Sequence, residues 1–316
     1  MIALLSLVAT ARLLDIVDFG AVAGSNSEAA INANIQALNK AFSTAQSGDT
    51  VLVAPAAAGP YTMRGNVVAN NLTNVSIRFE GDVVLDDTFD KWPMLNGRRP
   101  WLHINGSSNL TISGGGLIDG QGLRWWDASI TDSVHGIEGN RPNIMEINAS
   151  TDLLIENLRL HNSPRYHIRL DQCRRVEIRY INIEVDRVAQ RRIKARAHAL
   201  RLVQAGLNAS YALDLTQHIY LDGLTVGEDW RDWLLDQLVK LQVKVLPWVL
   251  EPEDLNTDGI DPAGADFYVH DVTINNDDDS IAVKPSDSRM ITTCSENMLF
   301  ERLVLTGFGA LADSPE

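Results

Sequence analysis

Short runs of β-branched and aliphatic residues recur along most of the chain, and each is broken by glycine, asparagine or aspartate. Such runs are typical of β-strands that end in turns. Their starts fall at irregular multiples of one coil of a β-solenoid, whose repeats are on the order of 20–30 residues. A β-sandwich is the alternative, but an N-x-x-I-x-x-x-x-I pattern repeats along the chain without the Asn-Gly pairs that mark tight hairpins between every strand. The runs are NVSIRFEGDVVLDD, NLTISGGGLIDGQG, DLLIENLRLHNS, RRVEIRYINIEVD, HIYLDGLTV, FYVHDVTINN and NMLFERLVLTGFG. We therefore predict an all-β fold, a parallel β-helix.

One amphipathic helix is predicted close to the start of the chain. Ser27 suits the N-cap position, and strand-like runs flank the helix, DIVDF before it and TVLVAPA after it. The apolar residues that recur at helical spacing are Ala30, Ile31, Ile35, Leu38 and Phe42. Terminal repeats of a solenoid need a cap over their exposed end, so we expect this helix to be an N-terminal cap.

A helical insertion is predicted from about residue 186 to 255, where the strand pattern is interrupted. Asp186–Leu207 should form a helix with Asp186 as N-cap and Gly206 as C-cap. Glu228–Val245 should form a second helix, ended by a proline, and HIYLDGLTV is a strand-like unit between the two. The apolar face of the second helix carries Trp230, Leu234, Leu238 and Leu241. We expect both helices to project from the solenoid and to leave its coils in register.

The first helix of this insertion is rich in basic residues. Such a helix could attract a polyanion, but a solvated helix face is the simpler interpretation and the one we prefer. The basic residues are Arg187, Arg191, Arg192, Lys194, Arg196 and Arg201.

Two clusters of carboxylates stand close together within residues 256–285, NTDGIDPAGADFYVHDVTINNDDDSIAVKP. Asp258 and Asp261 form the first cluster, and the three aspartates at 277–279 form the second. FYVHDVTI between them alternates and is rich in β-formers, so it is predicted to be a strand. Successive coils stack about 4.8 Å apart, so Asp258 should lie beneath Asp278 and the aspartate that follows it. Both of the upper carboxylates can face one cleft only if NNDDDS bends, which its composition favours.

Three carboxylates on one concave surface suit the hydrolysis of a glycosidic bond. A protonated carboxyl donates to the leaving oxygen, while an ionised one activates water. Crowding of like charges raises the pKa of one group, which keeps it protonated. For an inverting enzyme the acid and base carboxyls should be about 6.5–9.5 Å apart. A solvated acidic turn or a calcium site is the alternative for DDD alone, but its pairing with NTDGID one coil earlier favours catalysis.

The NTD motif and the double aspartate about one coil later resemble the signature of the polygalacturonase family, glycoside hydrolase family 28. The resemblance continues through DFGAVAG, IDGQGLRWWD, NSPRYHIRL and CSENMLFE. It implies a right-handed parallel β-helix that hydrolyses α-1,4-galacturonan or a related pectic polysaccharide with inversion at the anomeric carbon. By this resemblance Asp278 is the general acid, and Asp258 and Asp279 activate water. Asn256 would help to shape the subsite.

Four further residues are candidate substrate contacts. NSPRYHIRL matches a family segment that borders the active cleft, so Arg165 or His167 is expected to contact substrate. Trp125 and Trp126 are predicted to lie on a glycine-rich loop, and indole faces stack on sugar rings. We expect Trp126 at the cleft, with core or loop packing as the alternative. Lys284 is the basic residue close to the acid cluster.

No metal or cofactor is expected. His135, His161 and His167 lack the spacing of metal ligands and are interpreted as structural. Cys173 and Cys294 either pair or both remain free, and their positions in the sequence leave this open.

The chain departs from the family pattern at three places. The family usually has a short connection where this chain has its insertion. Where the family carries G-H-G, this chain has Gly307-Phe308-Gly309. The family's R-I-K follows the double aspartate, whereas RRIKAR precedes it here, so we interpret Arg192 and Lys194 as a coincidence. The chain stops at Glu316 before such a motif, and we expect its C-terminal end to be incomplete.

These departures keep two other functions open. The first is a catalytically weak, carbohydrate-binding β-helix. The second is a pectin-type polysaccharide lyase, which in this fold needs a basic residue and usually calcium near the acid cluster. Reducing-sugar release without the absorbance of an unsaturated product would distinguish a hydrolase from a lyase.

Composition narrows the partners. The chain has 316 residues, a net charge of −14 and a pI of about 4.9. An acidic surface argues against nucleic acids and anionic membranes as partners. A pectic polysaccharide, itself a polyanion, would need a local basic patch. We expect one β-helix domain over residues 12–316 that acts as a monomer.

A secreted glycoprotein is expected. Residues 1–11, MIALLSLVATA, have an apolar core and an A-T-A ending, which suits the remnant of a signal peptide, although an apolar first strand is the alternative. The N-glycosylation motifs begin at Asn71, Asn74, Asn105, Asn109, Asn148 and Asn208.

Overall fold

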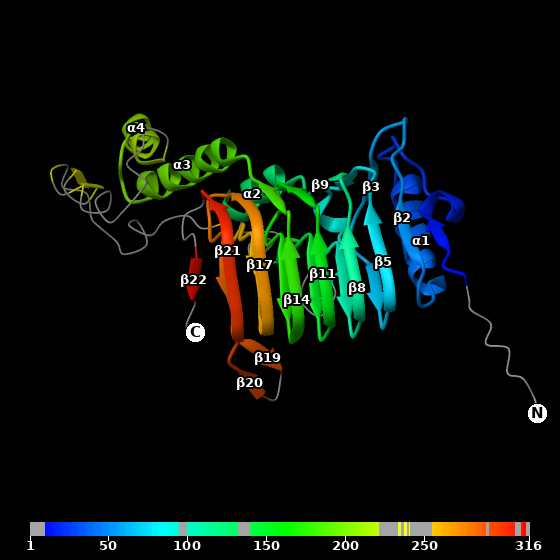
Figure 1. The fold of residues 1–316 in the computed structure, drawn as a ribbon. Helices are drawn as coiled ribbons and strands as arrows, with labels where there is room; N and C mark the ends of the chain where they lie inside the picture. The colour runs from blue at the N-terminus through cyan, green and yellow to red at the C-terminus, as the bar shows by residue number, and fades with distance from the viewer. Residues whose placement is uncertain are drawn as a thin grey trace, which may run out of the picture.

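The chain folds as a right-handed parallel β-helix, as predicted (Figure 1). The computed structural model describes residues 10–94, 100–131, 140–220, 233–234, 237–238, 240, 255–288, 291–306 and 311–313. Its coils stack side by side from a helical cap at the N-terminal end towards the C-terminus.

Parallel strands build two long sheets. The 13-stranded sheet contains β1 (Leu13–Asp15), β2 (Thr50–Val53), β3 (Tyr61–Met63), β5 (Thr73–Phe79), β6 (Val83–Leu85), β8 (Ser108–Ser113), β9 (Leu117–Asp119), β11 (Thr151–Glu156), β12 (Arg159–His161), β14 (Cys173–Arg179), β15 (Asn182–Glu184), β17 (Gly264–Asn275) and β21 (Glu296–Leu305). The 7-stranded sheet contains β4 (Val67–Asn70), β7 (Leu102–Asn105), β10 (Met145–Asn148), β13 (Ile168–Asp171), β16 (Ile260–Asp261), β18 (Ile281–Val283) and β22 (Leu311–Asp313). A short antiparallel pair, β19 (Ser286–Ser288) and β20 (Ile291–Thr293), lies between β18 and β21 in the sequence.

The predicted strand FYVHDVTI forms the greater part of β17, which is long enough to join two walls of the coil. Its first half pairs with β14 and its second half with β15, so both walls belong to one sheet. The 7-stranded sheet forms a further wall, and the candidate catalytic residues lie where that wall meets the end of β17.

Aliphatic side chains fill the interior and stack in register from coil to coil. Ile155 of β11 pairs with Ile112 of β8 on one side and with Ile178 of β14 on the other, and all three are fully buried. Burying such a side chain contributes roughly 1.5–3 kcal/mol relative to leaving it exposed. The coils therefore stabilise one another through these apolar columns.

A polar residue at the second position of several strands marks a fixed corner of the coil. Asn74, Asn109 and Asp152 occupy equivalent places in β5, β8 and β11, with φ of 54°, 51° and 55°. Asparagine and aspartate adopt this left-handed conformation more readily than other residues that carry a Cβ atom. The next equivalent place is filled by Arg175, whose Nε donates to Asp152 Oδ1 at 2.6 Å. The recurring N-x-x-I pattern thus records a repeated corner.

The N-terminal cap forms as predicted. A 3₁₀ helix, η1 (Ile16–Phe19), and α1 (Glu28–Thr44) lie against the first coils. Ser27 Oγ accepts a hydrogen bond from Ala30 N at 3.3 Å, which satisfies one of the free donors at the helix start. Leu38 and Phe42 are buried in the main core.

Helices α3 (Arg187–Gln204) and α4 (Ala209–Tyr220) follow β15 and project beyond the strands near the C-terminal end of the solenoid (Figure 1). The Asp186 side chain accepts from Ala189 N at 2.9 Å, so the predicted N-cap is confirmed. The C-cap is Ala205, one residue before the predicted Gly206, which takes a φ of 104°.

The coils keep their register across this insertion. Ile168 of β13 pairs with Ile260 of β16, and the β14–β17 ladder continues in the same way. The two helices have an apolar cluster of their own, separate from the solenoid core.

The prediction of a strand at HIYLDGLTV is wrong for the three residues of this segment that the structure describes, 218–220. Residues 218–220 form the last turn of α4, and Ile219 and Tyr220 are buried against α3 and its neighbours. Tertiary packing of an apolar helix face has overridden the local strand propensity. Residues 221–226 lie outside the described part of the chain. In the predicted helix Glu228–Val245, the described positions 233–234, 237–238 and 240 are helical.

Several other expectations concern chain ends and cysteines. Residues 1–9 of the predicted signal remnant and Gly307-Phe308-Gly309 lie outside the described residues. Cys173 is buried, Cys294 is exposed, and both are free. Where the chain is described, none of its helices has the length and apolarity needed to cross a membrane.

Candidate active site

Asp258, Asp278 and Asp279 meet on adjacent coils, as the sequence predicted. Asp258 lies just before β16, and the other two lie in the bend between β17 and β18. Ile260 of β16 pairs with Ile281 of β18, which sets Asp258 level with Asp279. One carboxylate oxygen from each aspartate lies within 4.8 Å of those from the other two. The coil register thus gathers three carboxylates at one place.

The closest oxygens of this acid cluster, Asp258, Asp278 and Asp279, approach more closely than the acid–base separation expected from the sequence. That expectation was about 6.5–9.5 Å between whole carboxyl groups, which leaves room for a water molecule. One oxygen from each of the three carboxylates lies within 4.8 Å of those from the other two. The two values differ in kind, because the predicted separation is measured between whole carboxyl groups.

A buried asparagine holds the predicted bend in shape. Asn276 Nδ2 donates to the carbonyl oxygens of Asp279, at 2.9 Å, and Thr257, at 3.1 Å. Its Oδ1 accepts from Ser280 Oγ at 3.0 Å. The first of these bonds closes the bend, and the second ties it to the loop that carries Asp258. The NNDDDS bend is confirmed, and its second asparagine closes it through buried hydrogen bonds.

A buried pair of carboxyls lies within the site. Asp258 is 2% exposed and Asp261 is 1% exposed. Burial, followed by repulsion from Asp261, raises the pKa of Asp258 well above its ordinary value of 3.8. The pKa of Asp261 is raised as well, chiefly by burial. Among the described residues, Oδ1 of Asp258 and both oxygens of Asp261 have no hydrogen-bond donor. A proton shared by the two carboxyls relieves both the repulsion and this deficit.

Lys284 supplies a positive charge beside this pair. Its Nζ lies 3.7 Å from Asp258 Oδ2. Burial disfavours the ammonium, but Asp261 and Asp258 outweigh that effect and raise the pKa of Lys284. Lys284 is therefore charged at neutral pH and lies next to the acid cluster.

Backbone donors orient the Asp278 carboxylate. Oδ1 accepts from Asp279 N at 2.8 Å, and Oδ2 accepts from Thr257 N at 3.4 Å. The second bond again joins the bend to the Asp258 loop. Asn256 lies at the start of that loop with a φ of 44°, a left-handed conformation that asparagine tolerates.

His167 has a different place from the one predicted. It is fully buried, so it is not exposed to contact a substrate. Its Nε2 accepts from Ser163 N at 3.2 Å, which assigns the ring proton to Nδ1, and Nδ1 donates to the Asp258 carbonyl oxygen at 2.9 Å. Burial lowers the pKa of His167 to about 4, so the ring is neutral. His167 is a positioning residue for the Asp258 backbone.

Arg165 and Tyr166 lie together at the edge of the site. Arg165 Nη2 donates to Tyr166 Oη at 3.1 Å, and its guanidinium lies 4.5 Å from the centre of the ring. Burial raises the pKa of Tyr166, and Asp258 and Asp261 add to that effect. Sequence reasoning missed Tyr166, although the ladder register sets it level with Asp258 in the preceding coil.

Trp126 does not border the cleft. Both Trp125 and Trp126 lie in α2 (Gly122–Thr131), not in the predicted loop, and both are fully buried. Trp126 Nε1 donates to the Ser163 carbonyl oxygen at 3.1 Å, and its ring packs beneath α3. Its prediction as a substrate contact is corrected to the alternative, packing in the core.

The first aspartate of the DDD run does not belong to the acid cluster. Asp277 Oδ1 accepts from Arg191 Nη2 at 2.9 Å, and its Oδ2 lies 3.5 Å from Lys194 Nζ. Arg187 Nε also reaches Oδ1 at 3.5 Å. Burial opposes the ionisation of Asp277, but Lys194 and Arg191 outweigh it and lower the pKa. Three basic residues of α3 therefore face the bend. The predicted solvated helix face holds for other basic residues of this helix, such as the exposed Arg192.

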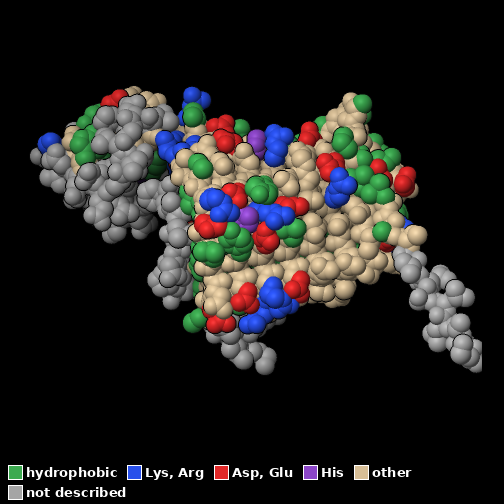
Figure 2. Space-filling model, viewed as in Figure 1, with side chains coloured by type: hydrophobic (Ala, Val, Ile, Leu, Met, Phe, Trp, Pro, Cys, Tyr) green, Lys and Arg blue, Asp and Glu red, His purple; other side chains and the backbone are tan. Residues whose placement is uncertain are grey.

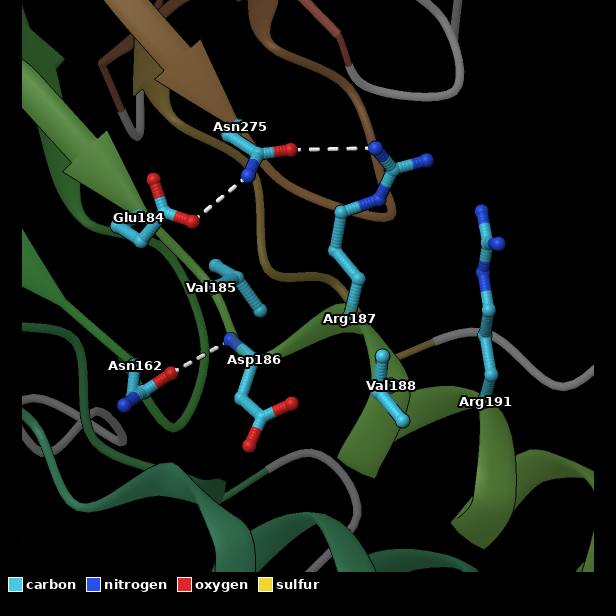
Figure 3. Close-up of a pocket in the computed structure, with 8 residues that line it drawn as sticks. All are labelled: Asn162, Glu184, Val185, Asp186, Arg187, Val188, Arg191 and Asn275. Carbon is cyan, nitrogen blue, oxygen red and sulfur yellow. Dashed lines mark hydrogen bonds between the residues drawn. The ribbon is translucent and has the colours of Figure 1, made fainter.

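A cavity of about 520 Å³ opens beside the start of α3 (Figure 3). Arg187 and Arg191 extend along one side of it, and Asn275 Oδ1 accepts from Arg187 Nη1 at 3.1 Å. Asn275 Nδ2 donates to Glu184 Oε1 at 2.7 Å. None of the three clustered carboxylates is among the described residues that line this cavity, so we place the candidate active site at the acid cluster.

The acid cluster also has the donors that a hard cation prefers. Calcium and magnesium bind carboxylate oxygens, and one oxygen from each of the three aspartates is close enough to share an ion. Lys284 competes with such an ion for Asp258.

Comparisons with known proteins agree with this architecture. Residues 49–192 match the sequence profile described as Glycosyl hydrolases family 28. Over 104 residues the chain is 33% identical to a protein named "Probable polygalacturonase" from Arabidopsis thaliana, a match that covers 33% of this chain and 23% of the relative. It is 30% identical over 149 residues to an exopolygalacturonase of Rhizopus delemar, covering 47% of this chain and 34% of the relative.

A solved structure shows the same fold. The family 28 exopolygalacturonase of Yersinia enterocolitica aligns with a TM-score of 0.61 at 12% identity, covering 96% of this chain and 50% of that one. The family profile ends at residue 192, before the acid cluster begins. The roles of Asp258, Asp278 and Asp279 therefore rest on their motifs and on their geometry.

Proposed function

We propose that this chain, which belongs to glycosyl hydrolases family 28 over residues 49–192, hydrolyses α-1,4-galacturonan or a related pectic polysaccharide. The observation that carries the proposal is the meeting of three carboxylates, from an NTD loop and a double-aspartate bend, on adjacent coils. The curated relatives named above are polygalacturonases, and the chain matches about a quarter to a third of their length.

The proposed reaction is a single displacement with inversion. A protonated carboxyl gives its proton to the glycosidic oxygen as the bond from that oxygen to the anomeric carbon breaks. A water molecule attacks the opposite face of this carbon and loses a proton to an ionised carboxylate. By the family resemblance, Asp278 is the acid, and Asp258 and Asp279 are the bases.

The place of the proton within the site bears on which carboxyl acts as acid and which as base. Burial raises the pKa of both Asp258 and Asp261, which favours a proton on this pair before a substrate binds. For Asp258 to act as a base, it must release that proton when the substrate binds. Transfer to Asp278 through one bridging water molecule would do this, because the carboxylate oxygens lie within 4.8 Å of one another. The cluster then holds one proton throughout, first on the base and afterwards on the acid.

Substrate capture is proposed for the basic and aromatic residues around the cluster. A galacturonate unit carries a carboxylate, and the chain as a whole is acidic, so a local cation is needed. Lys284, which pairs with Asp258, and Arg165, which donates to the half-buried Tyr166, are the proposed partners for such carboxylates. Asn256 is proposed to shape the subsite at the start of the Asp258 loop.

Secretion, N-glycosylation and a monomeric state belong to the same proposal. Five of the six sequon asparagines are exposed, and Asn148 is half-buried. Asn74 and Asn109 also use their amides in a ladder, since Asn109 Nδ2 donates to Asn74 Oδ1 at 2.9 Å. A glycan on Asn109 would be attached to the nitrogen that donates this hydrogen bond.

A lyase is the second candidate, favoured by one specific observation. Lys284 lies 3.7 Å from Asp258, and three carboxylates converge beside it, which are the parts that a calcium-dependent β-elimination needs. A lyase would give unsaturated products and lose turnover when calcium is chelated. We expect saturated products and turnover that survives chelation.

Two aspartate-to-asparagine variants test the acid and base roles. Asp278→Asn should lower kcat on galacturonan by on the order of 10²–10⁴-fold, since leaving-group protonation is lost. A galacturonide with a good leaving group needs little protonation, so it should restore much of that loss for Asp278→Asn and little of it for Asp258→Asn. Kinetics with both substrates distinguish the two roles.

The matched control is Asp266→Asn, the same substitution at an exposed corner of β17 with a φ of 62°. It should keep wild-type kinetics. Wild-type turnover by Asp278→Asn would remove Asp278 from the mechanism. If the activated substrate restored Asp258→Asn instead, the two roles would be reversed.

A further inference from the structure

Helix α3 contacts the loop that carries Asp258 through a buried hydrogen bond. Gln190 Nε2 donates to Thr257 Oγ1 at 3.1 Å, and both residues are fully buried. Thr257 directly precedes Asp258 in the chain, so this bond restrains the backbone from which the carboxylate extends. It links residues 67 apart in the sequence, one in the insertion and one in the solenoid.

One turn further along, the same face of α3 contacts the bend that carries Asp278. Lys194 follows Gln190 by four residues, so the two side chains lie on one face. Lys194 Nζ donates to the Asp277 carbonyl oxygen at 3.2 Å, and the residue is only 7% exposed. That carbonyl belongs to the peptide that joins Asp277 to Asp278. Arg191 adds a charged hydrogen bond to the Asp277 side chain.

We propose that α3 is a positioning element for the acid cluster, with Gln190 and Lys194 as its positioning residues. Each holds the residue that precedes one member of the cluster, and consecutive turns of a rigid helix fix the separation between them. The proposal concerns catalysis only in so far as the proposed hydrolase function holds. The contact itself stands on the geometry of the insertion.

The electrostatics of Asp277 agree with such a role. Arg187, Arg191 and Lys194 place three positive charges around one carboxylate that is 11% exposed. A buried carboxylate with several cationic partners is costly to separate from them, since removal would leave uncompensated charge on both sides. The bend is therefore held at Asp277, and the two aspartates that follow it remain directed towards Asp258.

The test compares Gln190→Ala and Lys194→Met with Arg192→Met in the full chain. Arg192 is the matched control, because it lies on the same helix beside Arg191 but is exposed. Amide hydrogen exchange is followed in peptides that cover residues 255–261 and 276–281, and in a peptide that covers β11. The reporter amides include Thr257 N, which donates to Asp278, and Gly259 N, which donates to Asp279.

In the two positioning variants we expect exchange to quicken about 10-fold or more in the two loop peptides and to stay unchanged in β11 and in Arg192→Met. On galacturonan, kcat should fall roughly 10- to 100-fold, as for a small misplacement of catalytic groups, while KM changes little. Lys194→Arg should recover most of the loss because it keeps the cation.

Loop exchange like that of Arg192→Met would overturn the proposal. So would exchange that quickens equally in β11, because the helix would then only stabilise the fold. A wild-type chain without turnover on galacturonan would refute the hydrolase function alone, and the exchange measurement would still decide whether α3 positions the cluster.

Discussion

Ile155 and Asp258 are both almost completely buried, yet they lie in regions that are stabilised in opposite ways. Ile155 stands in an apolar column, where each coil packs an equivalent residue against the next. Asp258 lies where the same coil register brings like charges together. Buried polar contacts from Asn276, His167 and Gln190 hold its loop in place.

This difference separates stability from function within one repeating architecture. The apolar columns gain free energy at every coil, while the acid loops keep carboxyls that are short of hydrogen bonds. Native structures accept such unfavourable groups at functional sites and compensate for them elsewhere. The exposed outer wall, which includes β11, β14, β17 and β21, belongs to neither class. Charged side chains gather on it (Figure 2) and pair with one another, as Arg179 does with Glu156 and Arg302 with Asp271.

The largest change in folding stability is expected from the apolar column. Ile155→Ala should lower the free energy of unfolding by about 2–5 kcal/mol, because it leaves a cavity that the neighbouring coils cannot fill. The kcat of the folded molecules should stay at the wild-type value, with an unchanged pH profile. Urea unfolding and kinetics below the unfolding transition measure both quantities. A shifted pH profile would show that the apolar column also affects the acid cluster.

A smaller change in folding stability, of opposite sign, is expected from a substitution in the loop that carries Asp258 and Asp261. Raised pKa values mean that folding favours the protonated carboxyls of Asp258 and Asp261. Their contribution to stability is full below the ordinary pKa of 3.8 and is lost as the pH rises through the raised values. Asp261→Asn removes one of the two ionisations. Its effect on the free energy of unfolding, relative to wild type, should therefore be more favourable at pH 8 than at pH 5, by on the order of 1 kcal/mol.

Thermal unfolding of wild type and Asp261→Asn at both pH values measures this difference. The acid-labile ion pairs elsewhere, such as Arg302 with Asp271, cancel in the comparison because both proteins contain them. A variant that loses stability equally at pH 5 and pH 8 would show that Asp261 is held by favourable contacts and not by a shared proton.

The sequence predicted the coils and the acid cluster because both depend on repetition. The N-x-x-I pattern marks one left-handed corner and one buried position in each coil, and it can be read within a single strand of the sequence. The separation of Asp258 from Asp278 is close to one coil, so the register alone brings them together. The helix cap at Ser27 and the N-cap at Asp186 were predictable from local side-chain chemistry.

The sequence did not predict what surrounds the cluster, because those contacts join distant segments. Gln190 and Thr257 have no local pattern that relates them, and His167 meets the Asp258 carbonyl across 91 residues. Trp126 resembled a sugar-stacking residue, but α3 covers it from a later part of the chain. Tyr166 could have been found by applying the coil register one step backwards from Asp258.

We propose that the three carboxylates of the acid cluster hydrolyse an α-linked galacturonan with inversion. Proton NMR of the first products formed by the wild-type chain from an oligogalacturonide tests it most directly. We predict saturated products whose new reducing ends are first formed as the β-anomer and only later mutarotate, at a rate that Asp278→Asn lowers. An α-anomer formed first, or an unsaturated product, would contradict the account.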